Sequence, residues 1–233
     1  MDIRKNRKQL SKIKWPKNSL TANNDCSVKK GNKHMKSVFF LLFVFVFFTS
    51  VTAKPVTLTA KYKIYMFGSN VGEFSVVQKT IDGNVTIDAI TEVEIGFIFS
   101  YRIKYVQKTE YKQGVLQKAK VKTYKNGKLN STMNLKYVNK RYILTIDGET
   151  STIKELIIYS GSLIYFNEPK GITRIFKERN AEMRQISPEG NHIYVIKDEK
   201  GELLNRYFYK NGVLQKATMR HTLATVELIR VNE

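Results

Sequence analysis

The stretch Val56–Met66, VTLTAKYKIYM, decides the fold class of this 233-residue chain. Every second residue from Val56 to Met66 is apolar or aromatic, and threonine, lysine and tyrosine stand between them. A period of two places the apolar side chains on one face of a strand and the polar ones on the other. The stretch therefore predicts a half-buried strand of an antiparallel sheet.

The same alternation returns along the chain, and short turns separate the repeats. It covers Val85–Ile95, Tyr101–Tyr111, Leu129–Tyr137 and Ala224–Leu228. The dipeptides between such runs are those that favour tight hairpins with positive φ, namely Asp82-Gly83, Asn126-Gly127, Asp147-Gly148 and Asn211-Gly212. The pattern predicts an all-β domain, an antiparallel up-and-down meander that curls into a barrel or half-barrel.

One segment interrupts the alternation, Ile153–Ser187. Its second half contains ITRIFKERNAEM, Ile172–Met183, which predicts a short helix with Ile172, Ile175 and Phe176 on one side. We expect this segment to be a helical or irregular crossover that closes or plugs the meander. Residues 54–233 are then a single β domain.

A nine-residue motif occurs twice in the chain. Tyr111–Ala119 reads YKQGVLQKA and Tyr209–Ala217 reads YKNGVLQKA. Two related halves of a pseudo-symmetric sheet would explain the match. Convergence on a favourable hairpin explains it as well and is the interpretation we favour, because turn chemistry alone restricts these residues.

The segment Met35–Ala53, MKSVFFLLFVFVFFTSVTA, predicts a secretory signal peptide. Lysines precede its apolar run, and Val51 and Ala53 occupy the small-residue positions of a cleavage site. An apolar run of about 11 residues spans about 16 Å as a helix, which is short for a membrane of about 30 Å. We expect cleavage before Lys54 and a soluble periplasmic or extracellular product.

The basic extension at residues 1–34 leaves two further interpretations open. Translation could begin at Met35, so that the first 34 residues are not part of the translated protein. Alternatively, the extension is a cytoplasmic tail and the apolar run an uncleaved N-terminal membrane anchor. The only cysteine, Cys26, precedes Lys54, so the exported domain would hold together without disulfides.

The net positive charge of the domain allows two interpretations, a specific anionic partner or a solvated surface. Eleven of the 40 basic residues and two of the 20 acidic ones precede Lys54, which leaves 29 and 18 and a net charge of +11. Such a surface attracts anionic lipid or acidic polysaccharide, whereas nucleic acid is a poor candidate outside the cytoplasm. A solvated lysine-rich surface with no specific partner accounts for the charge equally well.

Residues typical of catalysis are sparse. The chain lacks a phosphate-binding glycine loop, a paired-histidine zinc motif and a serine elbow, so no metal or cofactor is expected. Glu92 and Glu94 share one strand face that looks solvent-exposed, which argues against an acid–base pair. A hydrolase that gathers His192 with a serine and a carboxylate across the fold stays open, but the sequence favours a protein without catalysis.

Two sets of side chains are candidate sites. An amphipathic or lipid ligand at the mouth of the curled sheet would contact aromatic and apolar residues, although Tyr165 and Phe166 could instead plug the core. Alternatively, the protein is an envelope scaffolding or interaction protein whose rows of basic residues dock on an anionic membrane, or these rows simply keep the sheet soluble. The ligand candidates are Tyr101, Ile103, Tyr105, Tyr165 and Phe166, and the anionic-surface candidates are Arg102, Lys104, Lys118, Lys120 and Lys122.

Three stretches carry a family resemblance: YKIYMFGSNVGEFSVVQK (Tyr62–Lys79), the repeated YKxGVLQKA turn, and SGSLIYFNEP (Ser160–Pro169). Together they resemble exported all-β proteins of Gram-negative bacteria that are grouped in domain-of-unknown-function families. The resemblance implies a curved antiparallel sheet and a periplasmic or envelope location. It implies no activity and no functional residue.

Overall fold

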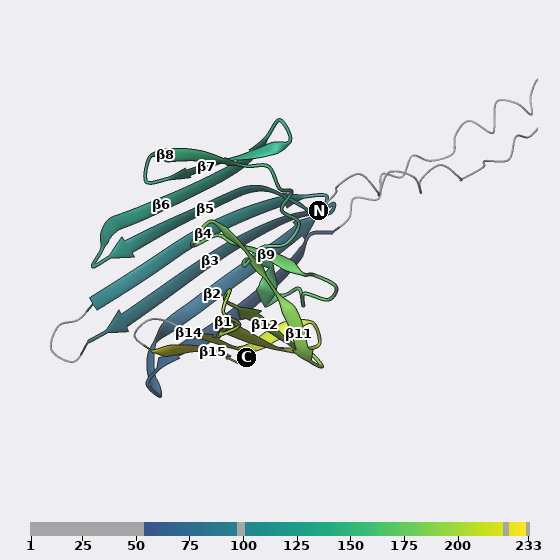
Figure 1. Cartoon of the computed structure of the whole chain (residues 1–233). Coiled ribbons are helices and arrows are strands. Elements are labelled where there is room, and N and C mark those ends of the chain that lie inside the picture. Colours follow the sequence, from purple (N-terminus) through teal and green to yellow (C-terminus); the bar gives the residue numbers. More distant parts are fainter. Residues whose placement is uncertain (1–53, 97–100, 221–223, 232–233) are drawn as a thin grey trace, which may run out of the picture. The chain divides into compact units, whose positions relative to one another are not determined.

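The computed structural model describes residues 54–96, 101–220 and 224–231, which belong to the compact unit Val51–Glu233 (Figure 1). This part of the chain is almost entirely β-structure, and its helical element is a single 3-10 turn, η1. The elements in chain order are β1 (Val56–Met66), β2 (Ser69–Ile81), β3 (Asn84–Ile95), β4 (Tyr101–Lys112), β5 (Val115–Lys125), β6 (Lys128–Val138), β7 (Arg141–Ile146), β8 (Glu149–Ile153), η1 (Leu163–Tyr165), β9 (Arg174–Lys177), β10 (Glu182–Gln185), β11 (Ser187–Gly190), β12 (Ile193–Lys197), β13 (Leu203–Lys210), β14 (Val213–Arg220) and β15 (Thr225–Arg230).

Thirteen of the strands form one antiparallel sheet in the order β11-β12-β13-β14-β15-β1-β2-β3-β4-β5-β6-β7-β8. In this sheet consecutive strands pair from β1 to β8 and from β11 to β15, and β15 also pairs with β1. The sheet is curved and stays open, because β11 and β8 are its two edges (Figure 1). The predicted meander and half-barrel are therefore confirmed.

The predicted tight turns are confirmed as well. In all four dipeptides both residues have positive φ, for example 48° at Asp82 and 73° at Gly83. Two successive positive φ angles define a type I′ turn, whose twist matches that of the strands it joins. The turns that the sequence marks thus set the ends of the hairpins.

The inner face of the sheet carries two apolar clusters. The first lies on β1 to β3 and β12 to β15, and the second lies mainly on β4 to β7. The crossover, residues 154–186, contributes buried side chains to both, with Ile164 and Ile175 in the first cluster and Ile157 and Phe176 in the second. The expected plug is therefore present, and the crossover covers the inner face where these clusters lie.

The predicted helix at Ile172–Met183 is wrong. This segment forms the hairpin β9–β10 instead, with Phe176 opposite Met183. Ile175 and Phe176 are both buried, but they face different clusters, as successive residues of a strand do. Burial on both sides fits a strand, in which successive side chains point to opposite faces, and not the predicted helix with one buried side.

The repeated motif forms two corresponding hairpins, β4–β5 and β13–β14. Both contain a β-bulge at the motif tyrosine, Tyr111 or Tyr209. The two leucines that follow the turns, Leu116 and Leu214, are fully buried. Both tyrosine hydroxyls donate to the crossover, Tyr111 to Ser160 Oγ at 2.7 Å and Tyr209 to the Ile164 carbonyl at 2.9 Å. The motif thus anchors the crossover from two parts of the sheet.

Candidate functional site

Tyr101, Ile103 and Tyr105 project from β4 toward the inner side of the sheet and are half-buried. They share this face with the buried Thr109 and Tyr111, which have the same parity along β4. Tyr105 packs against the second cluster, and the guanidinium carbon of Arg179 lies 4.8 Å from its ring centroid. Tyr101 and Ile103 lie beyond the clusters, toward the end of β4 that joins β3.

Tyr165 and Phe166 lie elsewhere, against the first cluster. The Tyr165 ring lies 4.5 Å from that of Phe74 and 5.8 Å from that of Tyr62, measured between centroids. These two candidates contribute to the packing of the crossover on β1 and β2. The five ligand candidates therefore belong to two separate groups, one on β4 and one in the crossover.

All five anionic-surface candidates lie on the outer side of the sheet. Along β5, Ala119 and Val121 are buried, so Lys118, Lys120 and Lys122 face outward. Arg102 and Lys104 face outward on the neighbouring β4 for the same reason. Two more lysines join this surface, Lys108 of β4 and Lys136 of β6, opposite Lys120 and Lys118. We call Lys108, Lys118, Lys120, Lys122 and Lys136 the lysine face.

Carboxylates neutralise the end of this surface where β3 and β4 join. Lys104 Nζ lies 2.7 Å from Glu92 Oε1, and Arg102 Nη2 lies 3.1 Å from Glu94 Oε2. The Glu92 and Glu94 side chains are more than half exposed, which confirms that they lie on a solvent-exposed face of the strand. Their partners on β4 follow from the register of the β3–β4 pair.

The lysine face itself is charged with little compensation. Lys118 forms an ion pair with Glu110 at 3.0 Å, but within the described residues no carboxylate lies in ion-pairing range of the other four lysines. Lys108 lies directly opposite Lys120 on β5 and opposite Asp88 on β3, and Lys118 lies directly opposite Lys136. Like charges in directly opposed positions destabilise a sheet. The opposed lysines therefore repel each other, and Asp88 and Glu110 offset part of that repulsion.

A buried polar cluster lies inside the crossover. Ser160 donates a short hydrogen bond to Glu178 Oε1, and the Ser162 backbone N–H donates to the same oxygen at 3.1 Å. The hydroxyls of Ser160 and Ser162 are 2.9 Å apart, and Tyr111 adds its hydroxyl from β4. Burial raises the pKa of Glu178, and these donors only partly oppose that effect.

This cluster joins three segments of the fold, and sequence reasoning missed it. The sequence signal was the serine pair in Ser160-Gly161-Ser162, which lacks the Gly-x-Ser-x-Gly spacing of a serine elbow. A Cβ on Gly161 would lie 2.8 Å from Glu178 Oε2, so glycine lets the carboxylate pack against the serine turn. Both serines and Glu178 are buried, so the arrangement serves to lock the crossover.

A second carboxylate, Glu168, links the crossover to β12. Its side chain is 3% exposed, and Oε1 accepts hydrogen bonds from Tyr194 Oη at 3.0 Å and His192 Nδ1 at 2.9 Å. Burial opposes ionisation of Glu168, but these hydrogen bonds and the charges of His192 and Lys170 outweigh it and lower its pKa. His192 is thus paired with a carboxylate, while His221 lies outside the described residues.

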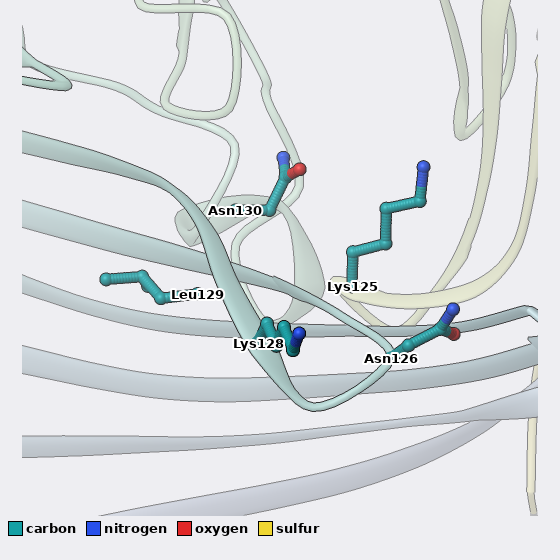
Figure 2. A pocket seen from close by; sticks show the side chains of 5 residues that line it. All are labelled: Lys125, Asn126, Lys128, Leu129 and Asn130. Carbon is teal, nitrogen blue, oxygen red and sulfur yellow. The ribbon is translucent and has the colours of Figure 1, made fainter.

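The two best-formed hollows of the described part are open depressions at one rim of the sheet. The first has a volume of about 340 Å³ and lies at the β5–β6 turn, lined by Lys125, Asn126, Lys128, Leu129 and Asn130. Figure 2 shows Lys125 and Asn130 extending to the same side of this turn. The second, of about 350 Å³, lies at the β1–β2 turn and includes Phe67. All five residues of the first hollow are exposed, so it is a surface feature.

Within residues 54–96, 101–220 and 224–231, no three side chains of His, Cys, Asp or Glu gather as a metal site. No helix in the same part of the chain is long and apolar enough to cross a membrane.

Comparison with known proteins shows which family the chain belongs to and which solved structure has a similar fold. The sequence model of a family described as "Domain of unknown function (DUF6134)" matches residues 62–231. No curated protein matches the chain in sequence. A crystal structure of a beta-barrel-like protein of domain of unknown function DUF1849 from Brucella abortus is similar, with a TM-score of 0.53 and 9% identity over 75% of this chain and 95% of that chain. At that identity the likeness concerns the fold alone.

Proposed function

Because the chain belongs to the DUF6134 family, whose function is unknown, we propose from its geometry that it is a non-catalytic module that binds a polyanionic partner through the lysine face. The observation that carries the proposal is the two pairs of directly opposed lysines, Lys108 with Lys120 and Lys118 with Lys136. An anion bound between the opposed lysines would relieve the repulsion that Asp88 and Glu110 leave. The sheet places the five lysines on three neighbouring strands, β4, β5 and β6, with their side chains on its outer side.

The experiment compares two double charge reversals in the full chain on an immobilised polyanion such as dextran sulfate. K120E/K122E alters the lysine face, and K197E/K200E alters exposed lysines at and beyond the end of β12. Both change the net charge by the same amount, so a difference between them reports position. We expect K120E/K122E to elute at much lower salt than K197E/K200E. Equal elution would show that only net charge matters and would refute the proposal.

A second candidate function is binding of an amphipathic ligand at the end of the inner face. Ile103 and Tyr101 are half-buried there, and Lys125 Nζ lies 4.7 Å from the Tyr101 ring centroid. An acyl chain could lie along the apolar side chains with its anionic group at Lys125. Native mass spectrometry of the full chain tests this function: a lipid-sized adduct that Ile103→Asp abolishes would support it, and a bare mass would refute it.

Export is also part of the proposal. The predicted signal peptide and the extension before it lie outside the described residues, so the support comes from the sequence of Met35–Ala53. N-terminal sequencing of the protein recovered from an exporting host tests it. A first residue of Lys54 would support cleavage, whereas retention of the apolar run would indicate an anchor.

A further inference from the structure

The β1–β2 turn carries an aromatic residue that folding does not explain. Phe67 is 79% exposed and has a φ of 51°, a conformation that is unfavourable for a bulky side chain. The other two-residue turns of this kind have polar residues at the same position, namely Asp82, Gln113, Asn126, Asn139, Asp147 and Asn211. Phe67 therefore combines a strained backbone with a ring that is largely exposed among the described residues.

A second exposed apolar residue lies on the same rim of the sheet. Leu129, just after the β5–β6 turn, is 55% exposed. The antiparallel registers from β1 to β6 bring the β1–β2 and β5–β6 turns to one rim, with the end of the β3–β4 pair between them. Both hollows described above lie at this rim.

The charges beside Leu129 select the partner. Lys125 and Lys128 are directly opposed across the turn, and both are exposed. A hydrated polysaccharide would satisfy these lysines but would leave Phe67 and Leu129 in water. An anionic bilayer satisfies both, because apolar side chains gain free energy in the acyl region while lysines contact the headgroups.

We propose that this rim inserts Phe67 and Leu129 into the surface of an anionic lipid bilayer, with Lys125 and Lys128 on the headgroups. The rim residues differ from those of the lysine face, so either site can fail without the other. Insertion would explain why a phenylalanine occupies this strained position, because Asn at position 67 would adopt the same backbone conformation with less strain.

The first test places a single tryptophan at the rim. The chain has one tryptophan, Trp15, so F67W in a Trp15→Phe background reports from the turn alone. I81W in the same background is the control, because Ile81 is 49% exposed at the opposite end of β2. On vesicles of phosphatidylcholine with phosphatidylglycerol, we expect F67W emission to shift to the blue and brominated acyl chains to quench it, with little change in I81W. Equal responses of the two, or no quenching of F67W, would overturn the proposal.

The second test measures affinity for the same vesicles. We expect Phe67→Asn to weaken binding about tenfold or more, as the loss of a buried phenyl ring implies. Ile81→Asn is the matched control and should leave the affinity unchanged. Elution of Phe67→Asn from dextran sulfate should match the parent chain, which separates this site from the lysine face. An affinity that Phe67→Asn leaves unaltered would overturn the insertion.

Discussion

The hydroxyl of Tyr111, in β4, donates a hydrogen bond of 2.7 Å to Ser160 Oγ in the crossover. Ser160 Oγ in turn donates a hydrogen bond to the buried carboxyl of Glu178. The contact joins one copy of the repeated motif to the segment that covers the inner face. The same segment that lacks alternation in the sequence is therefore held by specific polar contacts as well as by apolar packing.

We predict that Tyr111→Phe destabilises the domain by about 1 to 3 kcal/mol, because it leaves a buried group without its partner. Chemical denaturation measures the free energy of unfolding. Tyr137→Phe is the control, since within the described residues the Tyr137 hydroxyl makes no hydrogen bond while its ring packs on Tyr142 at 4.8 Å. Equal losses in the two variants would show that the Tyr111 hydrogen bond contributes nothing specific.

The two buried carboxyls should give opposite pH dependences. Burial raises the pKa of Glu178 above its usual 4.5, so the folded state holds this proton more tightly than the unfolded state does. Its contribution to stability is complete below pH 4.5 and is lost as the pH rises through the raised pKa. Stability of the parent chain relative to Glu178→Gln should therefore fall with rising pH.

For Glu168 the sign is reversed. Its pKa is lowered in the folded state, so its contribution is present above pH 4.5 and is lost as the pH falls through the lowered value. Glu168→Gln should be destabilised most near neutrality, with the difference from the parent chain shrinking in acid. Denaturation curves across the acid range measure both variants, and slopes of the same sign would contradict these assignments.

Close approach of two backbones makes Gly72 irreplaceable. A Cβ at this position would lie 2.0 Å from the Glu92 carbonyl oxygen of β3. Because both atoms belong to paired strands, we expect Gly72→Ala to cost about 1 to 3 kcal/mol or more. Gly190→Ala is the control, since its nearest neighbour would be Ile193 Cδ1 at 3.9 Å. A thermal unfolding midpoint for Gly72→Ala that matches the control would refute the assigned packing.

The repeated motif predicts a matched pair of core leucines. Leu116 and Leu214 are both fully buried, each just after its turn. Truncation of either to alanine should cost about 2 to 5 kcal/mol. Leu129→Ala, at an exposed site, should change stability by less than about 0.5 kcal/mol. A small loss at only one of the buried sites would show that the two hairpins are not equivalent.

The sequence predicted the features that depend on neighbouring residues. Alternation and the Asp-Gly and Asn-Gly dipeptides define the strands and turns, because both act within a few residues. The structure of the crossover could not be predicted from neighbouring residues. Ile175 and Phe176 face two clusters, and these clusters are formed by strands that are distant in sequence. The pairing of β15 with β1 is likewise a contact between the two ends of the domain, which no local pattern specifies.

The candidate site was predictable in part for the same reason. Parity along one strand showed that Lys118, Lys120 and Lys122 share a face. Whether a lysine forms an ion pair with a carboxylate depends on the register between strands, as in the Lys104–Glu92 pair. The sequence alone does not specify that register. The Ser160–Glu178 contact was missed because it joins residues 18 positions apart through a hairpin that we had predicted as a helix.

Lysine footprinting tests the proposed polyanion binding most directly. The full chain is acetylated with and without dextran sulfate, and mass spectrometry measures the reactivity of each lysine. We predict that Lys108, Lys120, Lys122 and Lys136 become protected together, whereas Lys197 and Lys200 keep their reactivity. Protection of all exposed lysines alike, or continued labelling of the lysine face in the bound protein, would contradict the account.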